Sequence, residues 1–425
     1  MRHTLIVLNP GHFHAALTLR KPHPQLNDDV YVYAEDGADI ERFLRIVHSF
    51  NQRAQEPTHW NLQVYCGVDH LERLREEHRG AVVIYAGKND VKMDVIHRLH
   101  ADGFHVLGDK PWLIGAHSIA LLRATTQTPP LAIDIMTERY EIACRVQKAL
   151  IAQRAVFGEF RSDGDRPAIE MISVHHLYKL VNGQPLVRPA WYFDIGVQGG
   201  GITDVMTHLA DLAQWMTGGN VAFDYSRDVE LKSARQWPTA VPLDTFKQIT
   251  GLEAFPSELH SHVVDGVLQY QCNGVIDYRL RGIPIRLESI WELAIAQGGG
   301  DTHYAIARGT RADVVVDQGA GTRFLTEVTV MPAEPNSSCA DALEQAVASL
   351  QTDFPGLGVA AEGSNFRVAI PTALRTTHEE HFAAVLDAFL ADIDNADRPA
   401  NAGPDLVTKY TLLGRAAELA LSAPA

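Results

Sequence analysis

The chain has 425 residues, of which 46% are hydrophobic and 21% are charged, and its formal net charge is -15. This composition is typical of a globular protein, and the length predicts two domains, each with its own core. The negative charge argues against nucleic acid and anionic membrane surfaces as partners, because both would repel the chain. A small-molecule substrate is therefore expected.

The four cysteines are scattered and none stands in C-x-x-C spacing, so the sequence predicts neither a zinc site nor a disulfide framework. The first apolar run, residues 5–8, is too short for the core of a signal peptide, and no later run reaches the length of a membrane span. We expect a cytoplasmic protein with no membrane contact.

Short apolar runs alternate with helix-length amphipathic segments through the first 135 residues. The runs lie at 5–8, 30–34, 63–66, 81–85, 105–107 and 131–134. Such alternation is typical of an α/β domain with a parallel, doubly wound sheet, that is, a Rossmann fold. In such a sheet a ligand binds beyond the carboxyl ends of the strands, where the strand order reverses.

Asn9, Gly11 and His14 occupy the three positions at which a dinucleotide-binding loop usually carries glycines. Gly11 is the position at which the backbone approaches the pyrophosphate, and Asn9 can adopt the left-handed conformation of the first glycine. His14 is bulky where helix and strand normally pack closely. The alternative is a plain strand-to-helix turn in which Asn9 and Gly11 are only turn residues.

Two acids, Glu35 and Asp36, end the second strand 24 and 25 residues after Gly11. An acid at this place binds the adenosine ribose of NAD and repels the additional phosphate of NADP, so the sequence favours NAD. Alternatively, these acids cap the helix that begins near Asp39.

A lysine, Lys110, follows the fifth strand, and a glycine run at 199–201 precedes Asp204, His208 and Asp211. Their spacing of four and three residues places the last three side chains on one face of a helix beginning near residue 203. The glycine run would allow a ligand to approach the backbone closely, or it is a flexible loop.

These residue types suit hydride transfer from an alcohol, which needs a base within reach of the hydroxyl proton. His208 is the natural base near neutral pH, Asp204 can fix its tautomer, and Lys110 can stabilise negative charge on the substrate oxygen. The alternative is structural: Asp204 would satisfy a helix dipole and His208 would be a hydrogen-bonded core residue.

Taken in order, Gly11, the acid pair and the segments 86–89, 103–111 and 199–211 resemble the Gfo/Idh/MocA oxidoreductases. That family is named for glucose-fructose oxidoreductase, inositol dehydrogenase and a rhizopine-catabolism protein. The family's Glu-Lys-Pro motif reads Asp109-Lys110-Pro111 here, and its Asp, His and Asp motif is matched after the glycine run. The resemblance covers about half of the chain and implies a Rossmann domain joined to a β-rich domain, NAD or NADP, and sugar or polyol substrates.

The resemblance also assigns residues to three roles. Catalysis is assigned to Lys110, Asp204 and His208. Cofactor binding is assigned to Asn9, Gly11, His12, Phe13, Glu35, Asp36, Ala86, Gly87, Asn89, Asp109, Lys110 and Arg139. Substrate binding is assigned to His176, Tyr178, Lys179, Asp204 and His208. No metal is expected, because the adjacent His175 and His176 lack a third ligand at suitable spacing.

The second domain is predicted to span residues 136–425, after a Rossmann domain at 1–135. A long helix is expected at 137–153, followed by strands at 168–178, 229–237, 262–272, 274–281, 285–294, 302–308, 312–317 and 323–330. The Asn273-Gly274 pair predicts a hairpin turn. Residues 238–260 and 331–364 are expected to be loops, and Thr377 with Glu380 predicts a capping box before a helix.

The strands predict a largely antiparallel sheet with one face against helices, and the other face free for a homodimer or homotetramer interface. The leading functional hypothesis is an NAD(P)-dependent oxidoreductase acting on a sugar, polyol or sugar derivative. Two alternatives stand beside it: an NAD-dependent glycosidase that works by transient oxidation and elimination, and a non-catalytic sensor of a dinucleotide or sugar.

Overall fold

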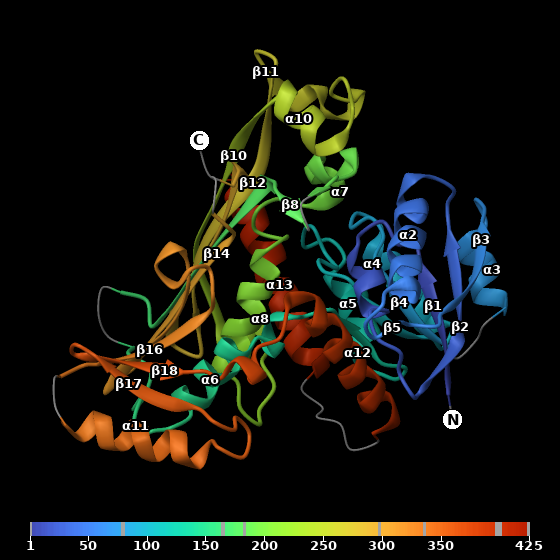
Figure 1. Cartoon of the computed structure of the whole chain (residues 1–425). Coiled ribbons are helices and arrows are strands. Elements are labelled where there is room, and N and C mark those ends of the chain that lie inside the picture. Colours follow the sequence, from blue (N-terminus) through green and yellow to red (C-terminus); the bar gives the residue numbers. More distant parts are fainter. Residues whose placement is uncertain are drawn as a thin grey trace.

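The computed structural model describes residues 2–77, 81–162, 166–181, 184–295, 299–334, 337–395 and 402–422. Figure 1 shows an N-terminal domain in blue beside a larger domain built around a broad sheet. The two-part α/β architecture expected from the sequence is confirmed.

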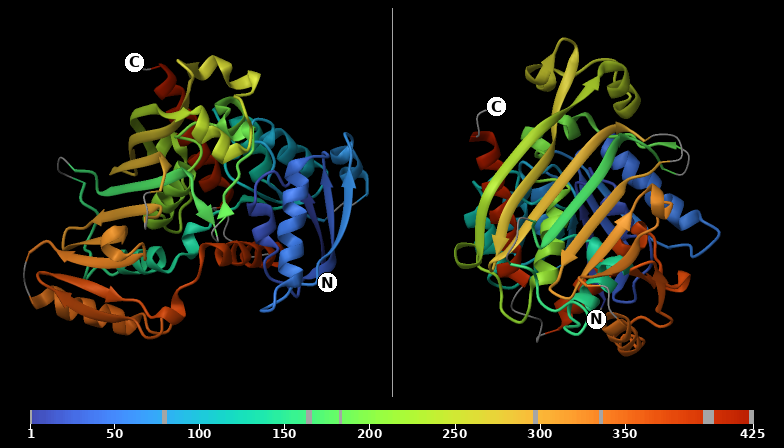
Figure 2. Two further views of the ribbon diagram at one scale, coloured as in Figure 1. Left: turned by 45° about the horizontal axis from the view of Figure 1, so that its top comes forward. Right: turned by 90° about the vertical axis from the view of Figure 1, so that its left-hand side faces the viewer.

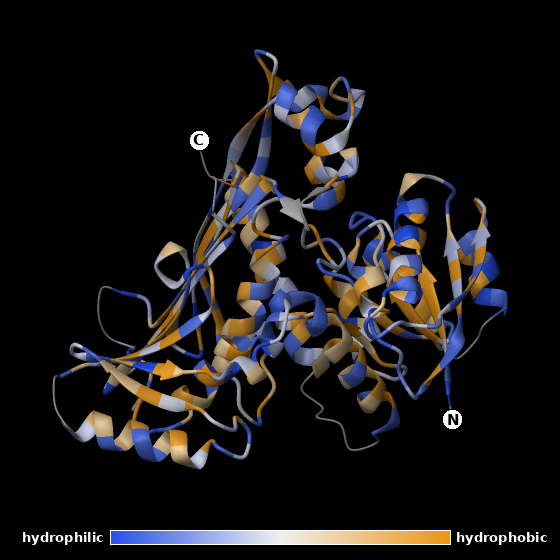
Figure 3. Ribbon diagram, viewed as in Figure 1, coloured by the Kyte–Doolittle hydropathy of each residue, from blue (hydrophilic) through white to orange (hydrophobic). Residues whose placement is uncertain are grey.

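The N-terminal domain contains a six-stranded parallel sheet with the order β3-β2-β1-β4-β5-β6. Its strands are β1 (His3–Leu8), β2 (Leu26–Ala34), β3 (Asn61–Cys66), β4 (Val82–Tyr85), β5 (His105–Gly108) and β6 (Ala132–Asp134). β1 and β4 are hydrophobic and buried because helices cover both faces of the sheet (Figure 3). The strand order reverses between β1 and β4, so their carboxyl ends frame the expected ligand position.

The connections carry helices α1 (His14–Thr18), α2 (Ala38–Gln52), α3 (His70–Glu77), α4 (Lys92–Ala101) and α5 (Ile119–Thr126). In α2 the apolar residues Ile40, Phe43, Val47 and Phe50 recur at three- and four-residue spacing and are all buried. Burial of this one stripe, rather than helix propensity, holds α2 on the sheet.

The C-terminal domain contains a ten-stranded mixed sheet, in which β7 pairs in parallel with β13 and the other pairings are antiparallel. Its order is β10-β12-β13-β7-β14-β15-β16-β18-β17, with β11 on β12. The strands are β7 (Ile169–Tyr178), β10 (Val229–Pro242), β11 (Val263–Val264), β12 (Val267–Leu280), β13 (Ile283–Ala294), β14 (Thr302–Arg308), β15 (Ala312–Gln318), β16 (Glu327–Pro332), β17 (Gly358–Glu362) and β18 (Asn365–Ala369). β8 (Leu180–Val181) and β9 (Gln184–Pro185) form a separate hairpin.

Helices cover the face of this sheet that looks toward the N-terminal domain, whereas the other face is open in the right-hand view of Figure 2. The α-helices are α6 (Ile142–Ile151), α7 (Ile195–Gln198), α8 (Met206–Thr217), α9 (Tyr225–Asp228), α10 (Leu243–Thr250), α11 (Ser337–Ser349), α12 (His378–Asp394) and α13 (Ala402–Ser422). Short 3-10 turns are η1 (Glu138–Tyr140), η2 (Ala190–Phe193), η3 (Ser257–His262), η4 (Ala320–Thr322) and η5 (Thr372–Leu374). None of the helices in the described ranges combines the length and the apolar composition that a membrane crossing requires.

Helix α12 joins the core of the first domain although it lies near the end of the chain. It begins at the expected capping box, in which the Glu380 side chain accepts from the Thr377 amide. Its buried Phe382, Leu386 and Phe389 pack in one cluster with β1 and β2. The core of the first domain is therefore completed by a segment that lies beyond the predicted boundary at residue 135.

The predicted turn at Asn273-Gly274 is wrong, because both residues lie inside the continuous strand β12. The hairpin between β12 and β13 instead turns at Arg281 and Gly282, which both have positive φ. The Asn273 side chain donates to the Trp237 carbonyl and accepts from the Trp291 amide, and so links three strands. A polar side chain satisfied across the sheet outweighs its turn propensity.

The loop predictions for 238–260 and 331–364 are also wrong in part. β10 continues to Pro242, α10 follows it with Phe246 and Ile249 buried, and α11 and β17 fill most of the second segment. The helix predicted at 137–153 is shorter, since the extended backbone of Glu141 separates η1 from α6. In each case packing of a few apolar residues decided the local structure.

Gly201 packs so closely against β12 that we expect a larger residue there to destabilise the fold. A methyl group on Gly201 would overlap the backbone carbonyl of Asn273, so Gly201→Ala should lower the free energy of unfolding by about 1–3 kcal/mol through overpacking. Gly321→Ala is the matched control, because a Cβ at Gly321 meets nothing within 4 Å, and its effect should stay within about 0.5 kcal/mol. Urea denaturation of both variants measures the difference, and equal stabilities would contradict the argument.

Candidate active site

A cavity of about 560 Å³ lies between the two domains and is lined from both sides. The N-terminal domain contributes the loop after β1 and the segments after β4 and β5. The C-terminal domain contributes residues before and within α8, on β7 and β14, and at the start of α12. This volume is in the range that small-molecule sites occupy.

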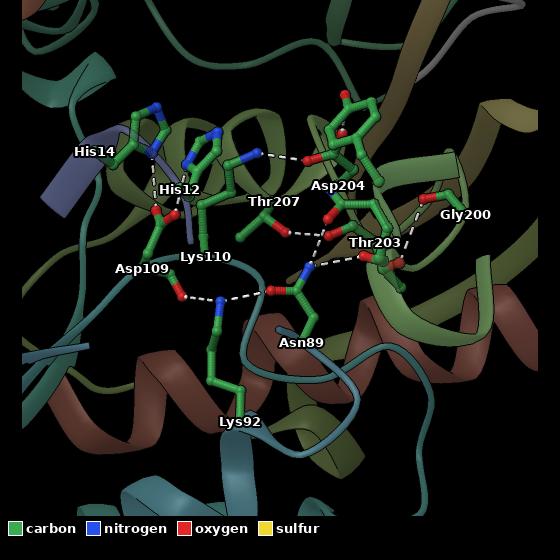
Figure 4. Close-up of polar contacts among 12 residues, drawn as sticks. His12, His14, Asn89, Lys92, Asp109, Lys110, Gly200, Thr203, Asp204 and Thr207 are labelled. Atoms are coloured by element: carbon green, nitrogen blue, oxygen red, sulfur yellow. Dashed lines mark hydrogen bonds and ion pairs between the residues drawn. The ribbon is translucent and has the colours of Figure 1, made fainter. Parts of the chain in front are cut away.

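Lys110 and Asp204 meet in the cavity wall. Lys110 follows β5 and Asp204 lies in the turn before α8, and the Lys110 Nζ to Asp204 Oδ1 distance is 2.6 Å (Figure 4). Each side chain is only 8% exposed. Burial raises the pKa of Asp204, but the Lys110 ammonium and its hydrogen bond outweigh this and hold that pKa below its usual value. The Asp204 carboxyl is therefore ionised, and its contact with Lys110 joins the two domains.

A second buried lysine, Lys92, helps to hold this wall of the cavity in place. Lys92 is 1% exposed and donates to Asn89 Oδ1 at 2.5 Å and to the Asp109 carbonyl at 2.9 Å (Figure 4). Asn89 in turn donates to the Gln198 carbonyl at 2.8 Å, which lies just before the glycine run. Burial lowers the pKa of Lys92 to about 8. Asn89, which the resemblance assigns to cofactor binding, thus also links one domain to the other.

His208 lines the same cavity from α8, and its buried Nδ1 has no hydrogen-bond partner in the described structure. Burial and the nearby Lys110 charge lower the pKa of His208 well below its ordinary value. The imidazole is therefore neutral at pH 7 and can accept a proton. The three residues assigned to catalysis, Lys110, Asp204 and His208, all line one cavity.

The loop after β1 has the backbone that a dinucleotide needs. Asn9 is left-handed, with φ of 42°, as expected for the first position of the loop. A Cβ at Gly11 would lie 3.3 Å from Asp39 Oδ2 and 3.6 Å from the Ala86 carbonyl, so a larger residue would fill the approach to the strand ends. The loop therefore fits a dinucleotide, with His12, Phe13, Gly87 and Asn89 lining the cavity at its inner end.

Glu35 and Asp36 are exposed at the end of β2, and the Glu35 amide lies 3.4 Å from Asn9 Oδ1. They do not cap α2 through their side chains, because the N-cap residue of that helix is Gly37. Both residues are therefore exposed at the position where an adenosine ribose is bound in this fold.

Opposite the lysine, β7 and the segment before β14 form a polar wall. His175 and Lys179 line the cavity, and Lys179 donates to Asp301 at 2.6 Å. His176 and Tyr178 are not among the lining residues, although His176 Nδ1 lies 2.9 Å from Oδ1 of the same Asp301 carboxylate. Of the three strand residues assigned to substrate, only Lys179 faces the cavity.

Arg139, assigned to the cofactor, is instead bound within the C-terminal domain. Its guanidinium makes two hydrogen bonds to Asp211, at 2.5 and 2.8 Å, and Lys409 binds the same carboxylate at 2.7 Å. The neighbouring Glu138 lines the cavity in its place. Asp211, the last acid of the motif, therefore belongs to a buried ion network and not to the cavity wall.

Several lining residues were not predicted from the sequence, because they lie outside the motifs that indicated a site. Glu138 and Glu141 lie just before α6, and His378 and His381 lie in the first turn of α12. Burial raises the pKa of Glu138, and the adjacent Glu141 raises it further. Two signals lay near them: the family resemblance marked Arg139, next to Glu138, and the capping box at Thr377 marked a helix start and not a site.

Comparison with known proteins shows which family this chain is related to. Residues 146–421 match the family model described as "Putative oxidoreductase C terminal domain". A "putative oxidoreductase" from Parabacteroides merdae has 38% sequence identity and a TM-score of 0.95, over 99% of this chain and 98% of that chain. No curated protein matches.

Two more distant structures share the fold. A levoglucosan dehydrogenase in complex with NADH and L-sorbose has 14% identity and a TM-score of 0.62, over 98% of each chain. A 3-ketoreductase from Actinomadura kijaniata in complex with TDP-benzene and NADP has 14% identity and a TM-score of 0.57, over 99% of this chain and 98% of that chain. The chain therefore belongs to the Gfo/Idh/MocA-like oxidoreductases.

Proposed function

We propose that this protein is an NAD(P)-dependent oxidoreductase that transfers hydride between the nicotinamide and a CH-OH carbon of a sugar, polyol or sugar derivative. The observation that carries the proposal is the convergence of Lys110 from one domain and His208 from the other in one cavity. Of the two distant structures of the same fold, the levoglucosan dehydrogenase is in complex with NADH and L-sorbose, and the 3-ketoreductase with NADP and TDP-benzene.

The bound cofactor would supply the hydride acceptor or donor. Lys110 would donate a hydrogen bond to the substrate oxygen and stabilise the negative charge that develops there. Asp204 holds the ammonium in position by the 2.6 Å contact. His208, which lines the cavity and is neutral, would take the hydroxyl proton as hydride leaves the carbon.

The polar wall of the cavity supports a hydroxyl-rich substrate. His175, Lys179 and Asp301 offer both donors and acceptors within it, which suits several hydroxyl groups on one ring. A cytoplasmic location, and a homodimer or homotetramer assembled through the open face of the C-terminal sheet, are part of the same proposal.

An NAD-dependent glycosidase remains a second candidate because the cavity also contains an acid with a raised pKa. Glu138, protonated more readily than an ordinary glutamate, could protonate a departing glycosidic oxygen. The two candidates differ in net redox. NADH accumulating in proportion to free sugar favours the dehydrogenase, whereas release of an aglycone without added cofactor favours the glycosidase.

His208→Gln tests the base. Since Nδ1 of His208 has no hydrogen-bond partner to lose, the variant should keep the thermal midpoint close to that of the wild type. Its kcat should fall by about 10²–10⁴-fold, because a glutamine cannot take the proton. The exposed His59→Gln is the control and should retain full turnover. Unchanged kcat in His208→Gln, measured on whichever sugar the wild type turns over, would refute the role.

Lys110 requires a paired design because its removal leaves the Asp204 carboxylate buried and unpaired. Lys110→Met alone should lower the free energy of unfolding by about 3–5 kcal/mol. Lys110→Met combined with Asp204→Asn removes both charges and should recover most of that stability while turnover stays abolished. Recovery of turnover together with stability would show that the pair serves the fold alone.

The acids after β2 predict a preference for NAD. The dissociation constant for NAD should be at least tenfold lower than that for NADP, because the additional phosphate would lie beside the carboxylates of Glu35 and Asp36. The double variant Glu35→Ser/Asp36→Ser should narrow this ratio, and Glu41→Ser on the exposed side of α2 should not. Fluorescence titration of each variant with both nucleotides checks this, and a wild-type preference for NADP would contradict it.

A further inference from the structure

Two histidines and an aspartate meet at the inner end of the loop after β1. His12 Nδ1 lies 2.8 Å from Asp109 Oδ2, and His14 Nδ1 lies 2.9 Å from Asp109 Oδ1 (Figure 4). The two imidazole rings are stacked edge to face with their centroids 3.9 Å apart. One ligand atom from each of the three residues lies within 4.8 Å of the other two.

These separations are those of neighbouring ligands around one ion. Nitrogen and carboxylate ligands bind first-row divalent metals at about 2.0–2.2 Å, so adjacent ligands of an octahedral ion stand about 3 Å apart. Two imidazoles and one carboxylate on one face of an ion, with the other positions open, form a recurrent metal site in proteins. The two hydrogen bonds to Asp109 hold the same trio together when an ion is not bound.

The trio is also a built site and not a surface cluster. Asp109 is 2% exposed and His14 is 7% exposed, and Lys92 anchors the Asp109 backbone. The neighbouring ammonium of Lys110 is already paired with Asp204, so the negative charge of Asp109 remains available for a cation.

The open side of the trio faces the cavity. His12, His14 and Asp109 all line it together with His208, whose buried Nδ1 has no partner in the described residues. An ion held by the trio would therefore keep free positions for water or a substrate oxygen within the same cavity.

We propose that His12, His14 and Asp109 bind a divalent transition-metal ion of the zinc and iron class at the edge of the candidate active site. The ion lies between the two Nδ1 atoms and the carboxylate, and each imidazole then carries its proton on Nε2. This goes beyond the proposed function, and it does not depend on dinucleotide binding or on hydride transfer.

Isothermal titration of the chelator-treated, full-length protein with zinc chloride, without nucleotide or substrate, tests the site. The wild type should bind one equivalent of zinc, and His14→Ala and Asp109→Asn should each weaken binding at least tenfold. The double variant His48→Ala/His59→Ala is the matched control, because both histidines are exposed on the same domain, and it should bind zinc like the wild type. Binding that is absent in the wild type, or unchanged in both site variants, would overturn the proposal.

A measurement on the unmodified chain covers the case in which a variant fails to fold. Anomalous X-ray scattering at the zinc edge, from crystals of the wild type grown with zinc, should place one ion within bonding distance of His12, His14 and Asp109. An ion found only at other histidines of the cavity, such as His303 or His381, would overturn the assignment. Because neither readout uses turnover, a failed oxidoreductase assay leaves this test intact.

Discussion

The contact between Lys110 and Asp204 is the constraint on which the candidate site depends. It joins the end of β5 to the turn before α8, and so brings an N-terminal strand edge against a C-terminal helix. Both charges are buried, and removal of either would leave the other unpaired in a medium that solvates it poorly. The cavity therefore exists in this form only while the two domains stay in contact at this point.

Other contacts also fix how the two domains meet. Asn89 ties the loop after β4 to Gln198, and Gly201 lets the chain pass directly over β12. The glycine run that suggested close approach to a ligand is pressed against the protein's own sheet, and this packing sets where α8 begins. His208 lines the cavity from α8, and burial and the charge of Lys110 keep its imidazole neutral.

The ion pairs formed by the cavity's charged groups indicate which groups can exchange protons. Lys110 is balanced by Asp204, Lys179 by Asp301, and Arg139 by Asp211 outside the cavity. Among the described residues, neither Glu138 nor His208 forms an ion pair. Burial raises the pKa of Glu138 and lowers that of His208, which favours the neutral form of each. Glu138 and His208 are therefore the candidates for proton exchange, because neither is held in an ion pair.

The sequence by itself determined the class of the fold and the motifs that meet in the cavity. The apolar runs of β1 and β4 are continuous because helices bury both faces, and this pattern is local and readable. Lys110, Asp204 and His208 were found because their spacing matches a family pattern. The capping box at Thr377 was found because its two bonds join residues three apart.

Only the tertiary structure decided which neighbours those residues have. Asn273 was predicted to be a turn residue, but its side-chain amide bonds to strands β10 and β13. Arg139 was predicted to bind the cofactor, but it binds Asp211, a carboxylate that Lys409 also binds. The trio of His12, His14 and Asp109 spans nearly a hundred residues of sequence. No local pattern encodes such contacts, because they form only when the parallel strands place the ends of β1 and β5 at the same edge of the sheet.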